Sequence, residues 1–347
     1  MRLGVDASNL ARDRRGMGRF VRSVLRAAVA AEDIELELLS TRGGDDAPIA
    51  AEFPGVPVRR AEAGARYDVV WCPWNGVRFS TKAPALVTIY DAFAFDEPAR
   101  GWVARRREQA PIRRAAREAE RVATISAWSR ERIVAQLGIE RERITVVPLA
   151  PDDAFFPGPS EALPEALRAR RYALLVGARE PRKNARLARE ACARAFAPGE
   201  TLVVVGELNP EDARLAKRLR LSIGAIAASD ETLRSLYRSA SVVLVPSIAE
   251  GFGLVAVEAL ACGAPVLAAN SAALPEAVEG LAPLLDPHDP DVWAEQIRRV
   301  FDEPAYAGGL RARGVARFAY ADRSGPARAT LALLSDLAGG RSKAPSP

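Results

Sequence analysis

Two carboxylates and two glycines lie close together in the segment 247–263, an arrangement suited to binding a phosphorylated ligand. Glu250 comes just before Gly251 and Gly253, and Glu258 lies about one turn into the short helix expected to follow. Glycines at a helix start let a ligand approach free backbone N–H groups at the positive end of the helix dipole. The segment therefore suits a phosphate or a pyrophosphate.

The two acids suggest contacts on either side of such phosphates. Glu258, one turn beyond the helix start, can reach a ribose diol on one side of the phosphates. Glu250, before the helix, can reach the group attached on the other side of the phosphates. Two other interpretations stay open. Gly251-Phe252-Gly253-Leu254-Val255-Ala256 also fits the G-x-G-x-x-A pattern of dinucleotide sites, with Glu276 as the ribose acid, although that pattern should follow its strand directly. A glycine pair can also simply allow a tight turn.

Arg182 and Lys183 are adjacent cations between a strand-like run, 172–176, and a helix-length segment. Cations at a helix start oppose the helix dipole, so a purely solvated pair would be unusual there. The pair, with Asn184 beyond it, is therefore a candidate for chemistry and not only for surface charge.

Short apolar runs alternate with helix-length amphipathic segments along the chain, which indicates an α/β fold. Runs such as 242–245 are apolar throughout, as in parallel strands that helices cover on both faces. The predicted strands are Leu3–Val5, Ile34–Leu39, Asp68–Cys72, Leu86–Tyr90, Val122–Ile125, Ile144–Val147, Tyr172–Val176, Leu202–Val205, Val242–Val245, Pro265–Ala268 and Pro283–Leu285. Frequent prolines in 148–164 defeat helix and sheet alike and predict a linker.

The pattern predicts two doubly wound Rossmann-like domains, and 347 residues give each one enough chain for its own core. We expect an N-terminal domain over 1–155, a C-terminal domain over 156–320, a helix over 321–338 that packs back toward the first domain, and a flexible tail over 339–347. Such domains bind ligands at the carboxyl ends of their strands, so the two should face each other across a cleft.

Composition excludes several classes of protein. The chain is 49% hydrophobic and 27% charged, and no apolar run approaches about 18 residues, so neither wholesale disorder nor a membrane span is expected. Cys72, Cys192 and Cys262 are too far apart for a disulfide framework or a metal ligand set. No export signal is found, and a cytoplasmic location is expected. The sole histidine, His288, lies in a turn, which argues against a histidine-dependent hydrolase or a zinc site.

Several motifs, in order along most of the chain, resemble the retaining glycosyltransferases of family 4, the glycosyl transferases group 1, which have the two-domain GT-B fold. Glu250 and Glu258 match the E-x7-E signature of that family. The other matching runs are 16–20, 176–184, 229–237, 245–254, 258–266, 274–276 and 284–287.

The resemblance implies transfer of a hexosyl or deoxyhexosyl group, with mannosyl or rhamnosyl favoured, from a nucleotide diphosphate sugar to an acceptor hydroxyl of a glycan, glycolipid or natural product. It also implies retention of anomeric configuration without cofactor or metal, so that cations and helix dipoles neutralise the departing diphosphate. The catalytic residues implied are Glu250, Arg182, Lys183 and Asp91. The donor-binding residues implied, mostly in the second domain, are Gly251, Phe252, Gly253, Leu254, Glu258, Gly177 and Tyr90. The acceptor or phosphate loop of the first domain is implied to contain Gly16, Gly18 and Arg19.

One pair of residues departs from the family pattern. Tyr90-Asp91 follows the run 86–89, where many members have His-Asp against the donor sugar. Either Tyr90 or Asp91 replaces that contact, or the donor differs. Three alternatives stay open: a nucleotide-sugar epimerase of the same fold, for which no carboxylate or histidine pair is found; a catalytically silent GT-B partner subunit; and a dinucleotide oxidoreductase.

The segment 100–121 holds eight arginines against Glu108, Glu118 and Glu120. Aromatic residues make up 6% of the chain and no nucleic-acid-binding module is found, so nucleic acid is not expected as a partner. Two interpretations remain. The segment is either a solvated surface of an arginine-rich chain, or a dock for an anionic partner. That partner would be the inner membrane face bearing a lipid-linked acceptor, where the protein would bind peripherally, or an acidic glycan.

Overall fold

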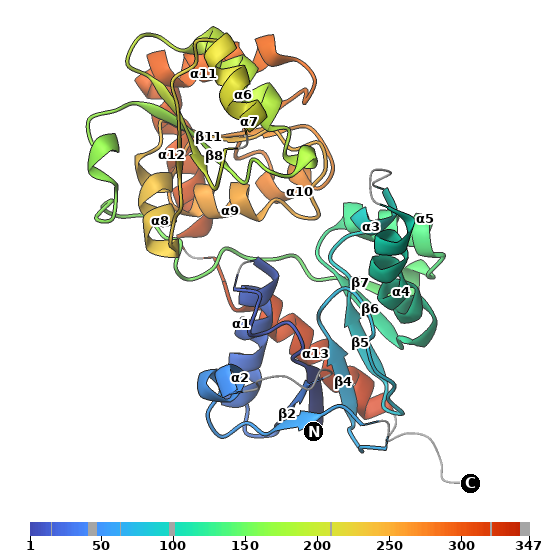
Figure 1. Ribbon diagram of the computed structural model, residues 1–347. Helices are drawn as coiled ribbons and strands as arrows, with labels where there is room; N and C mark the ends of the chain where they lie inside the picture. Colours follow the sequence, from blue (N-terminus) through green and yellow to red (C-terminus); the bar gives the residue numbers. More distant parts are fainter. Residues whose placement is uncertain are drawn as a thin grey trace. The chain divides into compact units, whose positions relative to one another are not determined.

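The computed structural model describes residues 1–14, 16–40, 47–62, 64–96, 101–208, 210–319 and 321–340. Within them the chain forms two units, each a parallel sheet flanked by helices (Figure 1). One unit holds Met1–Leu149 together with the chain from Ser324 onward, and the other holds Ala150–Arg323. The predicted α/β class with two Rossmann-like domains is confirmed.

The first unit contains a seven-stranded sheet in the order β3-β2-β1-β4-β5-β6-β7. Its strands are β1 (Arg2–Asp6), β2 (Glu35–Ser40), β3 (Val58–Arg60), β4 (Val69–Cys72), β5 (Ala85–Thr88), β6 (Arg121–Thr124) and β7 (Ile144–Val146). Its helices are α1 (Gly16–Ala30), α2 (Ala47–Glu52), α3 (Phe93–Asp96), α4 (Trp102–Glu118), α5 (Ala127–Leu137) and α13 (Gly325–Gly340). The C-terminal helix α13 packs against α1 and contacts β4 and β5.

Helices cover both faces of this sheet because successive strand side chains point to opposite sides. Val70 and Val87 belong to one buried cluster with Ile112 of α4 and Ile133 of α5. Trp71, between them in sequence, points to the other face, where it meets Phe20 of α1 with ring centroids 6.1 Å apart. Burial on both sides explains why these strands are continuous apolar runs in the sequence.

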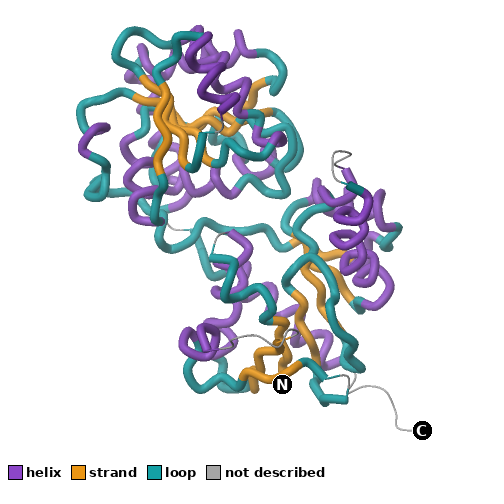
Figure 2. The backbone as a smooth tube through the Cα atoms, in the orientation of Figure 1, coloured by secondary structure: helices purple, strands orange, loops and turns teal. Residues whose placement is uncertain are grey.

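The second unit contains a six-stranded sheet in the order β10-β9-β8-β11-β12-β13, drawn in orange among its helices in Figure 2. Its strands are β8 (Tyr172–Val176), β9 (Thr201–Val205), β10 (Ile223–Ile226), β11 (Val242–Val245), β12 (Val266–Ala269) and β13 (Leu284–Leu285). Its helices are α6 (Ala185–Ala195), α7 (Pro210–Arg218), α8 (Asp230–Ser239), α9 (Leu254–Ala261), α10 (Leu274–Val278), α11 (Pro290–Asp302) and α12 (Pro304–Phe318). Strand order reverses between β8 and β11, as it does between β1 and β4 in the first unit, and such switch points are where doubly wound sheets bind ligands.

Two strands that the sequence did not predict, β3 and β10, lie at the sheet edges. Both are partly or fully exposed, and β3 carries Arg59 and Arg60. An edge strand has one neighbour and need not be apolar, so it lacks the signal that marks a central strand. At the C-terminus, α13 continues to Gly340, so residues 339–340 are helical and not tail; residues 341–347 lie outside the described part.

The boundary between the units falls after Leu149, earlier than the expected 155. Phe155 accounts for the difference, because its side chain is 0% exposed and its ring packs edge-on against Tyr237, centroid to centroid 5.8 Å. Arg323 also donates to the carbonyl of Asp152 at 2.9 Å. Prolines exclude regular structure in this segment but not packing, so the expected linker is largely part of the second unit.

We expect Phe155→Ala to destabilise the second unit by about 3–5 kcal/mol, the cost of removing a buried ring. Amide hydrogen exchange should then accelerate in β8 and β9 and stay unchanged in β1 and β4. The matched control is Phe156→Ala, since Phe156 is 43% exposed and should contribute under about 1 kcal/mol through its contacts with Arg234 and Arg238. Faster exchange in the first unit would contradict the assignment of this segment.

Candidate functional site at the switch point of the second sheet

Two loops leave neighbouring strands at the switch point of the second sheet. The loop after β8 begins with Gly177, at φ 78°, and forms a 3-10 turn over Pro181–Lys183. The loop after β11 leads to α9, and the backbone N–H of Ile248 within it donates to the carbonyl of Arg182 at 2.8 Å. A backbone hydrogen bond therefore holds the two loops together.

The structure brings the predicted residues Arg182, Lys183 and Glu250 into one cluster. Lys183 Nζ lies 2.5 Å from Glu250 Oε1, and an Arg182 guanidinium nitrogen lies 3.1 Å from Glu250 Oε2. Ser247, which the sequence did not single out, donates its hydroxyl to Glu250 Oε1 at 2.8 Å. Arg182 also pairs with Glu180. The carboxylate thus joins both cations across the two loops.

Glu250 is ionised in this setting although it is only 7% exposed. Burial works to raise its pKa, but the charges of Lys183 and Arg182, with hydrogen bonds from Lys183 and Ser247, outweigh burial and hold the pKa below its ordinary value of 4.5. Lys183 and Arg182 keep some solvent exposure, at 14% and 22% of their side chains. Both cations therefore remain reachable by an anion.

Two helix starts point into the same region without a side-chain cap. Gly253 precedes α9 with φ 100°, and Asn184 precedes α6 with φ 53°; neither side chain caps its helix. The φ of 100° at Gly253 strains any other residue, and a Cβ there would also come within 2.7 Å of the end of the Leu274 side chain, so glycine is favoured at this position. Uncapped N–H groups beside two cations form an arrangement suited to a diphosphate.

Glu258 lies on α9 and is buried, so it does not belong to an exposed helix face. The hydroxyl of Tyr237 lies 3.5 Å from its Oε2. Glu276, the acid that a dinucleotide fingerprint would use, is exposed on α10, beyond β12, whereas that fingerprint normally puts its acid at the end of the strand after the glycine-rich helix. The glycine pair therefore fits a dinucleotide site poorly.

The site residues expected in the first unit lie on two segments. Tyr90 follows β5 and is buried against Phe20, with ring centroids 6.2 Å apart; its hydroxyl has no hydrogen-bond partner in the described residues. Burial raises the pKa of Tyr90 well above its ordinary value. Asp91 accepts a hydrogen bond from the N–H of Phe93 at 3.1 Å, at the start of α3. Their roles toward a donor stay predictions.

Gly16, Gly18 and Arg19 form the first turn of α1, where a glycine-rich loop was expected. Gly18 has a packing role, because a Cβ there would lie 2.0 Å from the carbonyl oxygen of Asp13. Arg22, which sequence reasoning missed, donates to the carbonyls of Asp13 and Leu10 at 2.6 and 2.5 Å and pairs with Glu52. A buried arginine in an arginine-rich helix carries no sequence signal of its own.

Asp6, also missed, ends β1 at the switch point of the first sheet. Its Oδ1 accepts from the N–H and hydroxyl of Ser8, at 2.9 and 2.5 Å, and its Oδ2 has no hydrogen-bond partner in the described residues. Burial raises the pKa of Asp6, against the hydrogen bonds from Ser8 that lower it. The Asp6 side chain is fully buried, and its hydrogen bonds with Ser8 stabilise the loop that follows β1.

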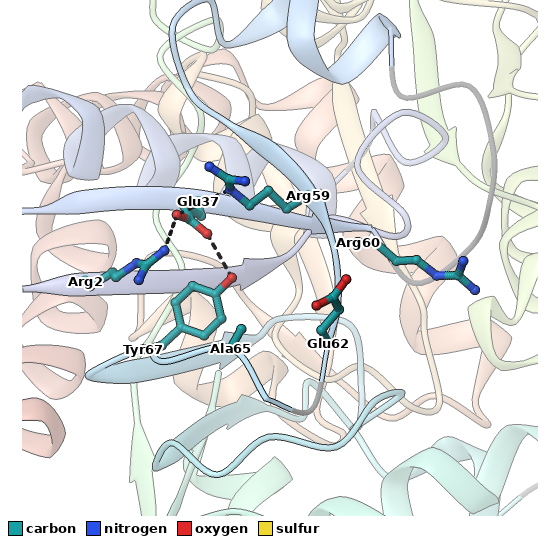
Figure 3. A pocket seen from close by; sticks show the side chains of 7 residues that line it. All are labelled: Arg2, Glu37, Arg59, Arg60, Glu62, Ala65 and Tyr67. Carbon is teal, nitrogen blue, oxygen red and sulfur yellow. Dashed lines mark hydrogen bonds and ion pairs between the residues drawn. The ribbon is translucent and has the colours of Figure 1, made fainter.

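A pocket of about 460 Å³ in the first unit has a different character (Figure 3). Glu37 is buried at its centre and is bound by Arg2 at 2.7 Å and by the Tyr67 hydroxyl at 2.9 Å. Arg59 lies 3.6 Å away. Arg2 begins β1, at the opposite end of the strand from Asp6. The carboxylate of Glu37 is fully paired, and its contacts with Arg2 and Arg59 join β2 to β1 and β3.

Within the described residues, no cluster of three or more His, Cys, Asp or Glu side chains is arranged to hold a metal ion. No helix in that part of the chain is long and apolar enough to cross a bilayer. Cys72, Cys192 and Cys262 are buried and unpaired with one another.

Two Rossmann-like domains, the second with paired loops and uncapped helix starts at its switch point, define the GT-B class of glycosyltransferase folds. Residues 164–315 match the family Glycosyl transferases group 1, and residues 64–150 match a Glycosyl transferase 4-like domain. Together the two matches span more than half of the chain. The chain belongs to the group 1, or family 4, glycosyltransferases.

Named relatives agree with this assignment. An O-antigen chain mannosyltransferase B of Escherichia coli is 32% identical over 57% of this chain and 56% of its own length. A D-inositol 3-phosphate glycosyltransferase of Mycolicibacterium smegmatis is 35% identical over 59% of this chain and 50% of its own. The chain thus spans about half the length of these curated relatives. The HepE protein of Anabaena, solved with UDP and glucose, shares the fold at TM-score 0.75 and 18% identity, over 96% of this chain and 99% of that one.

We expect Glu250→Gln to lower stability near pH 7, because it keeps the shape of the side chain but removes the negative charge that pairs with Lys183 and Arg182. The native pKa of Glu250 lies below 4.5, so its ion pairs stabilise the protein above that pH and lose their effect as the pH falls through the native pKa. The difference in unfolding free energy between wild type and variant should therefore shrink below about pH 4. Urea unfolding across pH measures it, and a difference that persists unchanged to about pH 2 would contradict the ion-pair account.

Proposed function

We propose that this protein is a retaining glycosyltransferase that moves a hexosyl or deoxyhexosyl group from a nucleotide diphosphate sugar to an acceptor hydroxyl, without metal or cofactor. The observation that carries the proposal is the joining of Arg182, Lys183 and Glu250 beside two uncapped helix starts at one switch point. Positive groups fixed in advance are what a departing diphosphate needs.

In the proposed reaction the bond between the sugar C1 and the diphosphate oxygen breaks, and a bond from C1 to the acceptor oxygen forms on the same face. The acceptor proton passes to an oxygen of the leaving phosphate. Arg182 and Lys183 stabilise the charge that develops on the diphosphate, and the N–H groups at the start of α9 add to it. Glu258 holds the ribose and Glu250 contacts a sugar hydroxyl. Either Tyr90 or Asp91 replaces the contact that many family members make to the donor sugar with His-Asp.

A mannosyl or rhamnosyl donor is supported by the form of the loop Glu180-Pro181-Arg182-Lys183-Asn184 and by the mannosyltransferase among the relatives. The acceptor, a glycan, glycolipid or natural product, is assigned to the first unit near Gly16 and Arg19. No nucleic acid is involved in the proposed function. The proposed location of the protein is the cytoplasm, and its proposed donor substrate is a nucleotide sugar.

A thermal-shift panel of UDP, GDP, dTDP and NAD tests the proposal first. At least one nucleoside diphosphate should raise the melting temperature, since a ligand at about 100 times its Kd stabilises by about 2.7 kcal/mol. The Glu258→Ala variant should bind that nucleotide about 1–3 kcal/mol more weakly, through loss of charge-assisted bonds to ribose. Stabilisation by NAD alone would overturn the proposal in favour of an oxidoreductase.

Replacing Arg182 and Lys183 with alanine should lower kcat/KM by about 10²-fold or more, because both cations act on charge that develops in the transition state. Release of nucleoside diphosphate from the donor measures the rate. Arg186→Ala is the matched control, since Arg186 is exposed on α6 and pairs with Glu190 on the same helix. Wild type should keep its rate in EDTA; inhibition that Mg²⁺ or Mn²⁺ reverses would contradict the metal-free mechanism.

A further inference from the structure

Helix α4 is attached to the first unit through its buried side, and also through Arg114, which donates to the Ser80 hydroxyl at 2.8 Å, and the carbonyl of Pro111, which accepts from the N–H of Val77 at 3.1 Å. Ile112 and Ala115 are buried in the cluster beneath the helix. Arg105 donates to the carbonyl of Phe95 at 2.8 Å, and Gln109 donates to the carbonyl of Ala94 at 2.7 Å. These contacts fix the position of the helix beside α3 (Figure 1). The opposite side of α4 is exposed along most of its length.

The exposed side combines arginines with apolar side chains. At about 100° per residue, Trp102, Arg106, Arg113 and Arg117 fall within about 60° of one another around the helix. Trp102 is 76% exposed, more than any other large hydrophobic side chain in the described residues. We call this side of α4 the basic face; Val103, Ala110, Arg107 and Arg114 widen it to about 140°, and Arg114 is bound to Glu118 and Ser80.

The positive charge on the basic face is largely uncompensated. Arg106, Arg107 and Arg117 form no ion pair with any described residue. Glu118, at the edge of the face, is bound by Arg114 at 2.8 Å. Glu108 falls on the other side of the helix.

We propose that the basic face of α4 docks reversibly on a lipid bilayer that contains anionic phospholipids. Arginines alone would suit any polyanion, including an acidic glycan. Trp102 and Val103 favour the bilayer, because an indole and a short apolar side chain at one end of a cationic face match the interface between headgroups and acyl chains. Only these two large apolar side chains are available, so the helix lies on the surface and does not insert deeply. The inference is independent of the proposed transfer reaction.

Vesicle flotation of the full chain tests this proposal without any need for substrate. Wild type should float with vesicles of phosphatidylcholine and phosphatidylglycerol at low salt, and should neither float with phosphatidylcholine alone nor stay bound in about 0.5 M NaCl. The triple variant Arg106→Gln, Arg107→Gln, Arg117→Gln should bind about 10²-fold more weakly, at about fivefold per arginine.

A second triple variant controls for net charge. Arg26→Gln, Arg214→Gln and Arg218→Gln remove the same charge from exposed positions on α1 and α7, and vesicle binding should be kept. Trp102→Gln should also weaken vesicle binding, whereas binding to heparin beads, a purely anionic glycan, should not depend on Trp102. Absence of flotation by wild type, equal loss in both triple variants, or equal vesicle binding by Trp102→Gln would each overturn the proposal.

Discussion

One carboxylate, Glu250, determines the arrangement at the switch point of the second sheet. Lys183 comes from the loop after β8 and Glu250 from the loop after β11, so their contact closes a connection between strands that are neighbours only in space. Arg182 is also held by Glu180 and the carbonyl of Ala249, but Glu250 is the carboxylate that pairs with both Arg182 and Lys183 and so offsets the repulsion between these adjacent cations. Glu250 therefore contributes to the position of both cations, at the cost of burying a charge.

This arrangement has a consequence for ligand binding. Glu250 and a diphosphate are both anions, and each would bind the same two cations, Arg182 and Lys183. A diphosphate would therefore compete with Glu250 for these contacts. Its Oε1 already accepts from Lys183 and Ser247, and its Oε2 faces Arg182. An ionised carboxylate offers about four lone-pair positions, so one more hydroxyl donor can still be accepted. Contact with a sugar hydroxyl and orientation of the cations are thus compatible tasks.

The sequence predicts best what depends on local chemistry. Central strands such as Val242–Val245 are found because burial on both faces demands apolar runs, and the cations and acids are found because glycines and charges at a helix start are unusual. It fails where long-range packing decides. The edge strand β3 has no apolar requirement, and Phe155 is drawn into the second unit by Tyr237, far along the chain. The pairing of Glu250 with Lys183 has the same origin, since only the fold makes the two loops neighbours.

The composition of the chain explains why an arginine in the sequence is a weak indication of a functional site, whereas a lysine is a stronger one. Arginines in this chain commonly bind main-chain carbonyls; Arg311, for example, donates to the carbonyls of Gly263 and Ala240. The planar guanidinium suits such multiple contacts, whereas an ammonium is a compact point charge. Of the 49 basic residues only Lys82, Lys183, Lys217 and Lys343 are lysine. Among these four lysines, Lys183 is the one that contacts Glu250. In the proposed function its ammonium would act as a point charge on a phosphate oxygen of the donor. Because lysine is rare in this chain, a lysine at position 183 is a more specific signal of a site than an arginine there would be.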